Sequence, residues 1–84
     1  MDLNTCDLAL SSYLIASGCA LKSYARDPKS QRVYFTLSNE EQDPHTLQDP
    51  HTLRELYFSG EATVNALKFA EQLKSLKALC HSII

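Results

Sequence analysis

The sequence predicts a small α+β domain in which helices pack on one face of a β-hairpin. Three observations lead to this prediction. An apolar stripe at helical spacing comes first, alternating residues follow on both sides of a turn, and two further helical stripes come last. Because 84 residues suit one domain, we assign residues 1–84 to a single unit. The predicted order is helix, two-stranded hairpin, helix, helix.

The composition argues against several classes of protein. A hydrophobic content of 44% argues against disorder, and a net charge of −2 argues against a chain devoted wholly to coating nucleic acid. No apolar run reaches the roughly 20 residues of a membrane helix, and no basic segment precedes an apolar one at the N-terminus. We therefore expect a cytoplasmic protein without a membrane partner. Because so small a domain buries only roughly 60% of its unfolded surface, we also expect a homodimer.

The first predicted helix covers residues 5–17. Asn4 or Thr5 can cap its start, and Gly18 can provide a left-handed exit. Apolar residues recur in it at the i, i+3, i+4, i+7 spacing of a core-facing helix.

A hairpin is predicted next, because residues 19–26 and 31–38 alternate on either side of turn material at 27–30. If Arg26 stands opposite Arg32, one face of the hairpin covers the core. The residues expected on that face are Cys19, Leu21, Ser23, Ala25, Val33, Phe35 and Leu37.

Residues 39–52 are polar and are predicted to form a variable surface loop. The hexapeptide DPHTLQ at 43–48 recurs within it as DPHTL at 49–53. One copy is enough to start the next helix, with Asp49 as its cap and Pro50 at its first position. The other copy is then spare loop.

The last two helices are separated by the break at Ser59 and Gly60. The first of them is expected to end near Phe58, and the second to begin between Glu61 and Asn65. In the second, apolar residues recur four and three apart as far as its end. This seam is expected either to cover the hairpin alone or also to pair with a second chain. The candidate dimer or partner interface is Phe69, Leu73, Leu76, Cys80 and Ile83.

The sequence contains no motif typical of catalysis or metal binding. The cysteines are Cys6, Cys19 and Cys80. Their odd number makes no closed disulfide framework, and free cysteines usually pack in a core. Cys80 and His81 are neighbours, and adding His45 and His51 gives no recognised ligand spacing. There is no glycine-rich phosphate loop, GxSxG or HExxH. We therefore expect no enzyme activity, no metal and no cofactor.

The outward face of the hairpin, together with its turn, is the candidate binding surface. In the expected register Tyr24 faces Tyr34, and Lys22 faces Thr36. Residues 22–32 carry a local net charge of +3, which leaves −5 for the rest of the chain. Aromatic rings beside cations can stack bases and neutralise phosphates, so single-stranded nucleic acid is the preferred partner. A solvated face and a protein partner remain alternatives. The assigned residues are Lys22, Tyr24, Arg26, Lys29, Arg32 and Tyr34.

Three blocks of the chain are also similar to a known pattern: TCDLALSSYLIASGCAL, QRVYFTL and ELYFSGEATVNALKFAEQLKSLKALC. Together they resemble a small domain family of unknown function found in bacterial and phage genomes. The resemblance covers most of the chain outside residues 39–52, chiefly at core and helix positions. It implies a phage or mobile-element context and a short stand-alone protein. It brings no activity, ligand or catalytic residue.

These observations give two hypotheses of function. The first is a non-enzymatic binding or adaptor module that contacts nucleic acid or a nucleoprotein complex through the hairpin face. The alternative is a protein-interaction or assembly subunit, an accessory of a phage or mobile element, that binds through the apolar last helix. Salt dependence separates them, because phosphate contacts weaken steeply as salt rises and apolar packing does not.

Overall fold

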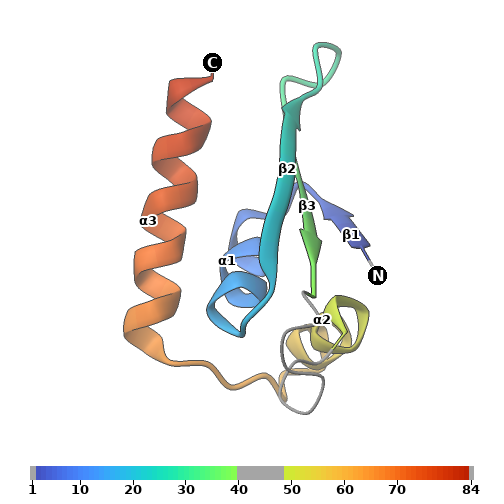
Figure 1. Ribbon diagram of the computed structural model, residues 1–84, viewed down its shortest axis with the longest axis vertical. Coiled ribbons are helices and arrows are strands. Elements are labelled where there is room, and N and C mark those ends of the chain that lie inside the picture. The colour runs from blue at the N-terminus through green and yellow to red at the C-terminus, as the bar shows by residue number, and fades with distance from the viewer. Residues whose placement is uncertain (1, 40–48, 84) are drawn as a thin grey trace.

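The computed structural model describes residues 2–39 and 49–83, which form a three-stranded sheet and three helices (Figure 1). The α+β class is confirmed, but the sheet is larger than the predicted hairpin. The elements in chain order are β1 (Asp2–Thr5), α1 (Leu8–Ala16), β2 (Ala20–Arg26), β3 (Val33–Ser38), α2 (Pro50–Ser59) and α3 (Ala66–Ser82).

Strand β3 lies at the centre of the sheet, in the order β1-β3-β2, and is antiparallel to both neighbours. Strands β1 and β2 are therefore parallel to each other, with α1 connecting them and β3 inserted between them. Val33, Phe35 and Leu37 alternate along β3 and are at most 8% exposed on its helix side. The buried apolar core is Leu3, Leu10, Tyr13, Leu14, Cys19, Val33, Phe35, Leu37, Leu53 and Leu76.

The predicted first helix, 5–17, is wrong at its start, because the helix begins at Leu8 and Thr5 belongs to strand β1, which was not predicted. Asn4 pairs with Thr36 of β3 and donates a hydrogen bond to its hydroxyl at 2.9 Å. The cap of α1 is Asp7, whose carboxylate accepts from the backbone N–H of Leu10 at 3.0 Å. Strand β1 buries one apolar side chain, Leu3, and is held by pairing with a distant strand, so it leaves no periodic signal in the sequence.

The predicted register of the hairpin is also wrong. The pairing of β2 with β3 shifts between Leu21 and Ser23, which leaves Lys22 as an extra residue. Such a bulge reverses the face on which every later side chain of the strand lies. Ser23 and Ala25 therefore leave the core face, while Tyr24 and Arg26 turn toward it. Their partners are Thr36 for Ser23, Phe35 for Tyr24, Tyr34 for Ala25 and Val33 for Arg26.

Helix α2 is confirmed at both ends. Asp49 caps it by accepting from the backbone N–H of His51 at 3.2 Å, and Pro50 is its first residue. Gly60 ends it with a left-handed φ of 81°, which glycine adopts without strain. The first copy of the repeat, at 43–48, lies outside the described residues.

Helix α3 begins at Ala66, one residue beyond the predicted range, with Asn65 as its cap. It packs against α1 on the helix side of the sheet (Figure 1). None of the helices formed by the described residues has the length and apolar character needed to cross a lipid bilayer.

Candidate nucleic-acid interface

The loop of the β2–β3 hairpin is ordered by Asp27. Its carboxylate accepts hydrogen bonds from the backbone N–H of Lys29 at 3.0 Å and from the Ser30 hydroxyl at 2.9 Å. These two bonds stabilise the charged form and hold the pKa of the Asp27 carboxyl below its usual value of 3.8. The backbone of Asp27 bonds to Gln31 and Arg32, both at 2.8 Å, and Gln31 has a φ of 65°. The loop is therefore a defined turn that fixes where its cations emerge.

The loop end of the hairpin is a two-stranded ribbon. Strand β1 stops at Thr5, opposite Phe35, so β3 is paired only with β2 at Val33 and Tyr34, and its other edge is not covered by a described strand there. In Figure 1 this end lies well beyond α1 and β1. All side chains from Lys22 to Arg26 on β2 are exposed. The ribbon is therefore accessible around its loop and along its outer edge.

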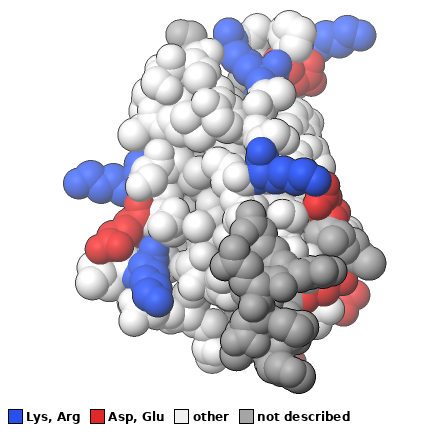
Figure 2. Space-filling model, viewed as in Figure 1, with Lys and Arg blue, Asp and Glu red and all other residues white. Residues whose placement is uncertain are grey.

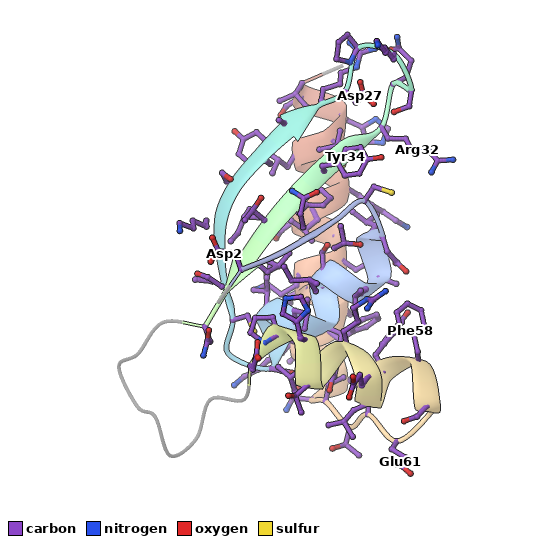
Figure 3. The ribbon with its side chains drawn as sticks, turned by 90° about the vertical axis from the view of Figure 1, so that its right-hand side faces the viewer. Asp2, Asp27, Arg32, Tyr34, Phe58 and Glu61 are labelled. Atoms are coloured by element: carbon purple, nitrogen blue, oxygen red, sulfur yellow. The ribbon has the colours of Figure 1, made fainter. Side chains whose placement is uncertain are left out.

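The bulge distributes the two tyrosines of the candidate surface over opposite faces. Tyr24, 46% exposed, lies on the helix side with Arg26, two residues further along the same strand. Tyr34 lies on the open face, by which we mean the face of the sheet away from α1 and α3. Figure 3 shows Tyr34 on that face and Arg32 projecting outward from the loop beside it. Tyr24 and Tyr34 therefore do not face each other, as the expected register required.

Three cations gather at this end of the molecule and are named the basic tip here: Arg26, Lys29 and Arg32. All three are exposed, and none takes part in a salt bridge within residues 2–39 and 49–83. The contact of the Arg32 guanidinium with the described residues is a long one to a sulfur atom, with Nη1 3.9 Å from Sγ of Cys6. Figure 2 shows the basic side chains at the hairpin end, with acidic atoms beside them. Asp27 is the nearby acid in sequence, and its oxygens are already occupied by the turn.

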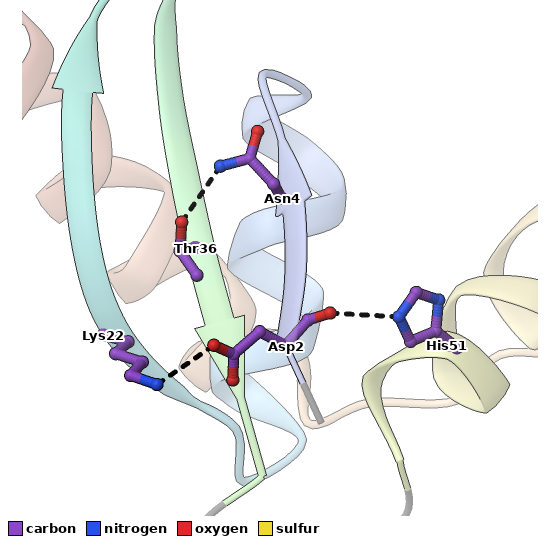
Figure 4. Close-up of polar contacts among 5 residues, drawn as sticks. All are labelled: Asp2, Asn4, Lys22, Thr36 and His51. Atoms are coloured by element: carbon purple, nitrogen blue, oxygen red, sulfur yellow. Dashed lines mark hydrogen bonds and ion pairs between the residues drawn. The ribbon is translucent and has the colours of Figure 1, made fainter.

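Lys22 stands apart from the basic tip. Its Nζ lies 3.0 Å from Oδ2 of Asp2, across the open face from β1 (Figure 4). In the same region the ring Nε2 of His51 lies 3.1 Å from the backbone carbonyl of Asp2. These contacts connect Asp2 to β2 and α2. The predicted binding surface therefore has two parts, the basic tip and Lys22, which forms a salt bridge with Asp2.

The residues proposed for a dimer or partner interface lie along the inward side of α3. Leu76 is 4% exposed and belongs to the core. Phe69, Cys80 and Ile83 pack against that core, and Leu73 is half-buried. The seam is thus used within the chain, while Leu67, at 68% exposed, lies outside it.

Cysteines and histidines are possible metal ligands and nucleophiles; the three cysteines are free, and Cys19 is buried. No group of three or more His, Cys, Asp or Glu residues there could hold a metal ion. Burial, and to a smaller extent the negative charge of Asp49, raises the pKa of the Cys19 thiol to about 11. A thiol that keeps its proton at neutral pH is a poor nucleophile. His45 lies outside the described residues.

The sequence reading missed an aromatic group formed by α1 and α2. The ring centroids of Tyr13 and Tyr57 are 5.6 Å apart, and those of Tyr57 and Phe58 are 5.2 Å apart. The guanidinium of Arg54 lies 5.4 Å from the centroid of Phe58. Tyr13 is far from Tyr57 and Phe58 in the sequence, and nothing in the spacing of apolar residues shows that these rings meet.

Comparison with known proteins adds no relative. No family model, no curated protein and no solved structure matches the chain significantly. The interpretation therefore depends on the chain's own geometry.

Proposed function

We propose that this protein is a small non-enzymatic binding module that holds nucleic acid through the basic tip of its hairpin. The observation that carries the proposal is that Arg26, Lys29 and Arg32 lie exposed on one ordered loop and ribbon without an acidic partner among the described residues. Cations that have no acidic partner and lie at one end of a molecule give that end a positive potential, which favours an anionic partner there. A phosphate backbone supplies regularly spaced anions of the required sign.

The geometry favours a groove of duplex nucleic acid over a single-stranded partner. Single-strand binding by stacking needs neighbouring rings on one surface, and Tyr24 and Tyr34 lie on opposite faces of the ribbon. A two-stranded ribbon fits the major groove of B-form DNA, which is about 12 Å wide. In that position Lys29 in the loop, and Arg26 and Arg32 beside the loop, can reach the phosphates on both sides of the major groove.

The alternative function, a protein-interaction or assembly subunit that binds through α3, has less support. The apolar seam of that helix is already packed on the core, so a partner would have to use another part of its surface. A phage or mobile-element role is compatible with either function and is retained as part of the proposal.

Fluorescence anisotropy with labelled duplex and single-stranded oligonucleotides of one sequence tests the proposal. Three phosphate contacts predict a slope of about −2.7 in log K against log salt, and hence about 40-fold weaker binding at 200 mM than at 50 mM salt. The triple variant Arg26→Ala, Lys29→Ala, Arg32→Ala should lose most of that slope. We expect the duplex to bind more tightly than the single strand.

A matched control removes the same charge elsewhere. Lys68, Lys74 and Lys77 are exposed on α3, and their combined replacement by alanine changes the net charge equally. This control should retain binding. Equal loss in both triple variants would show that only the total charge matters, and no salt-sensitive binding by the wild-type protein would overturn the proposal.

A further inference from the structure

A second surface of the molecule, remote from the basic tip in the fold, has the form of a small-molecule pocket. It is a hollow of about 280 Å³ that is open to solvent, beside the segment at 61–65 that joins α2 to α3. Three aromatic rings and three small or aliphatic residues line it, namely Tyr13, Tyr57, Phe69, Gly60, Ala62 and Val64. None of these residues is charged. Its volume is close to the lower end of the range of ligand pockets, about 300–1,000 Å³.

Two of the lining side chains, Tyr13 and Tyr57, carry a hydroxyl, and Tyr13 is the more deeply buried of the two. The residue is only 3% exposed, and its hydroxyl makes no hydrogen bond with any described residue. Every side-chain oxygen or nitrogen sealed inside the described part of the chain does have a partner. The small exposed area of Tyr13 therefore includes its hydroxyl oxygen, which can both donate and accept.

The walls of the pocket are already in place without a ligand. The rings of Tyr13 and Tyr57 contact each other at an angle of 32°, and they come from different helices. Ala62 and Phe69 pack against the main core. A neighbouring cavity of about 330 Å³ shares Tyr13 and Val64 and has polar residues such as Thr63 along its rim. Tyr13 thus lies where an apolar space meets a polar one.

We propose that this pocket binds a small neutral molecule with one aromatic ring, or two fused rings, and a single hydrogen-bonding group. The rings would stack against Tyr57 and Phe69, and the polar group would bond to the Tyr13 hydroxyl. An apolar cavity of about 150 Å³ already holds benzene in another protein, so about 280 Å³ leaves room for a substituted ring. The absence of charge on the lining residues disfavours ionic ligands, whose desolvation would go uncompensated.

The test is an NMR titration of the isotope-labelled protein with phenol, toluene and benzoate as probes. Phenol should shift the amide signals of Gly60, Ala62 and Val64 in a saturable way, and benzoate should not. Tyr13→Phe keeps the ring and deletes the hydroxyl. It should weaken phenol binding about 3- to 10-fold, the range of one hydrogen bond, and leave toluene binding unchanged.

A variant whose pocket is filled by a larger side chain, and a probe that mimics a tyrosine residue of a protein, complete the experiment. Ala62→Leu should abolish binding of both rings while the circular dichroism spectrum stays that of a folded protein. Equal weakening of phenol and toluene by Tyr13→Phe would overturn the role of the hydroxyl. If N-acetyl-tyrosine amide binds more tightly than phenol, the pocket recognises a protein side chain, and the assignment to a free small molecule is wrong.

Discussion

Asp27 is the single residue that most clearly connects the sequence to the position of the basic tip. Its carboxylate bonds to the N–H of Lys29 and to the Ser30 hydroxyl, and these bonds lower its pKa. Because the pKa in the folded protein lies below the unfolded value of 3.8, the carboxylate contributes stability above that pH. This contribution is lost as the pH falls through the folded-state pKa.

Replacement of Asp27 should therefore have a pH-dependent effect on stability. We expect Asp27→Ala to unfold at lower urea concentration than the wild type at pH 7, and the difference to shrink as the pH falls below 3.8 and through the folded-state pKa of the carboxyl. Urea titrations at neutral and acidic pH, followed by circular dichroism, measure the unfolding midpoints of the two proteins. Glu61→Ala is the control, since the Glu61 side chain makes no hydrogen bond in the described structure. A deficit of Asp27→Ala that is equally large at both pH values would mean that its charge plays no part.

At the scale of the elements, local signals were sufficient to identify the three helices, though not the start of α1, and they were insufficient for the sheet. Helix α2 was predicted at both ends, because Asp49, Pro50 and Gly60 act on the backbone within a few residues. Strand β1 and the bulge at Lys22 depend on pairing with β3, and no local pattern encodes them. The candidate binding surface was likewise predicted only in part. Its residues were named from the sequence, but Tyr24 and Arg26 lie on the opposite face from the predicted one, because the register shifts at Lys22.

The cap of α2 gives a prediction at this scale. Asp49→Ala removes the bond to the N–H of His51 and should lower the free energy of unfolding by about 1 kcal/mol. Asp49→Asn keeps a side-chain oxygen at the same position and should lose less than half of that. Chemical denaturation of the three proteins measures the difference. Equal losses in both variants would attribute the effect to the charge and not to the capping bond.

The whole molecule is slightly extended for its size. The Cα radius of gyration is 12.6 Å, against about 12 Å for a compact chain of this length. The hairpin and α3 account for this, because both continue past the short helix α1 between them (Figure 1). Sequence periodicity predicted the seam of α3, but it could not distinguish a seam buried within the chain from one shared with a second copy. Both need the same apolar spacing, and within the single chain α3 packs on α1.

A substitution in that seam distinguishes the two arrangements. Leu76 is 4% exposed in a single chain, so Leu76→Asp places an unpaired charge in the core and should lower the free energy of unfolding by about 3 kcal/mol or more. In a domain this small, such a loss removes most of the folded population. Leu67→Asp, on the same helix at 68% exposed, should change stability by no more than about 0.5 kcal/mol. Thermal melts measure the stability of each variant, and size-exclusion chromatography measures its oligomeric state. A folded, monomeric Leu76→Asp beside a dimeric wild type would instead assign the seam to an interface between copies.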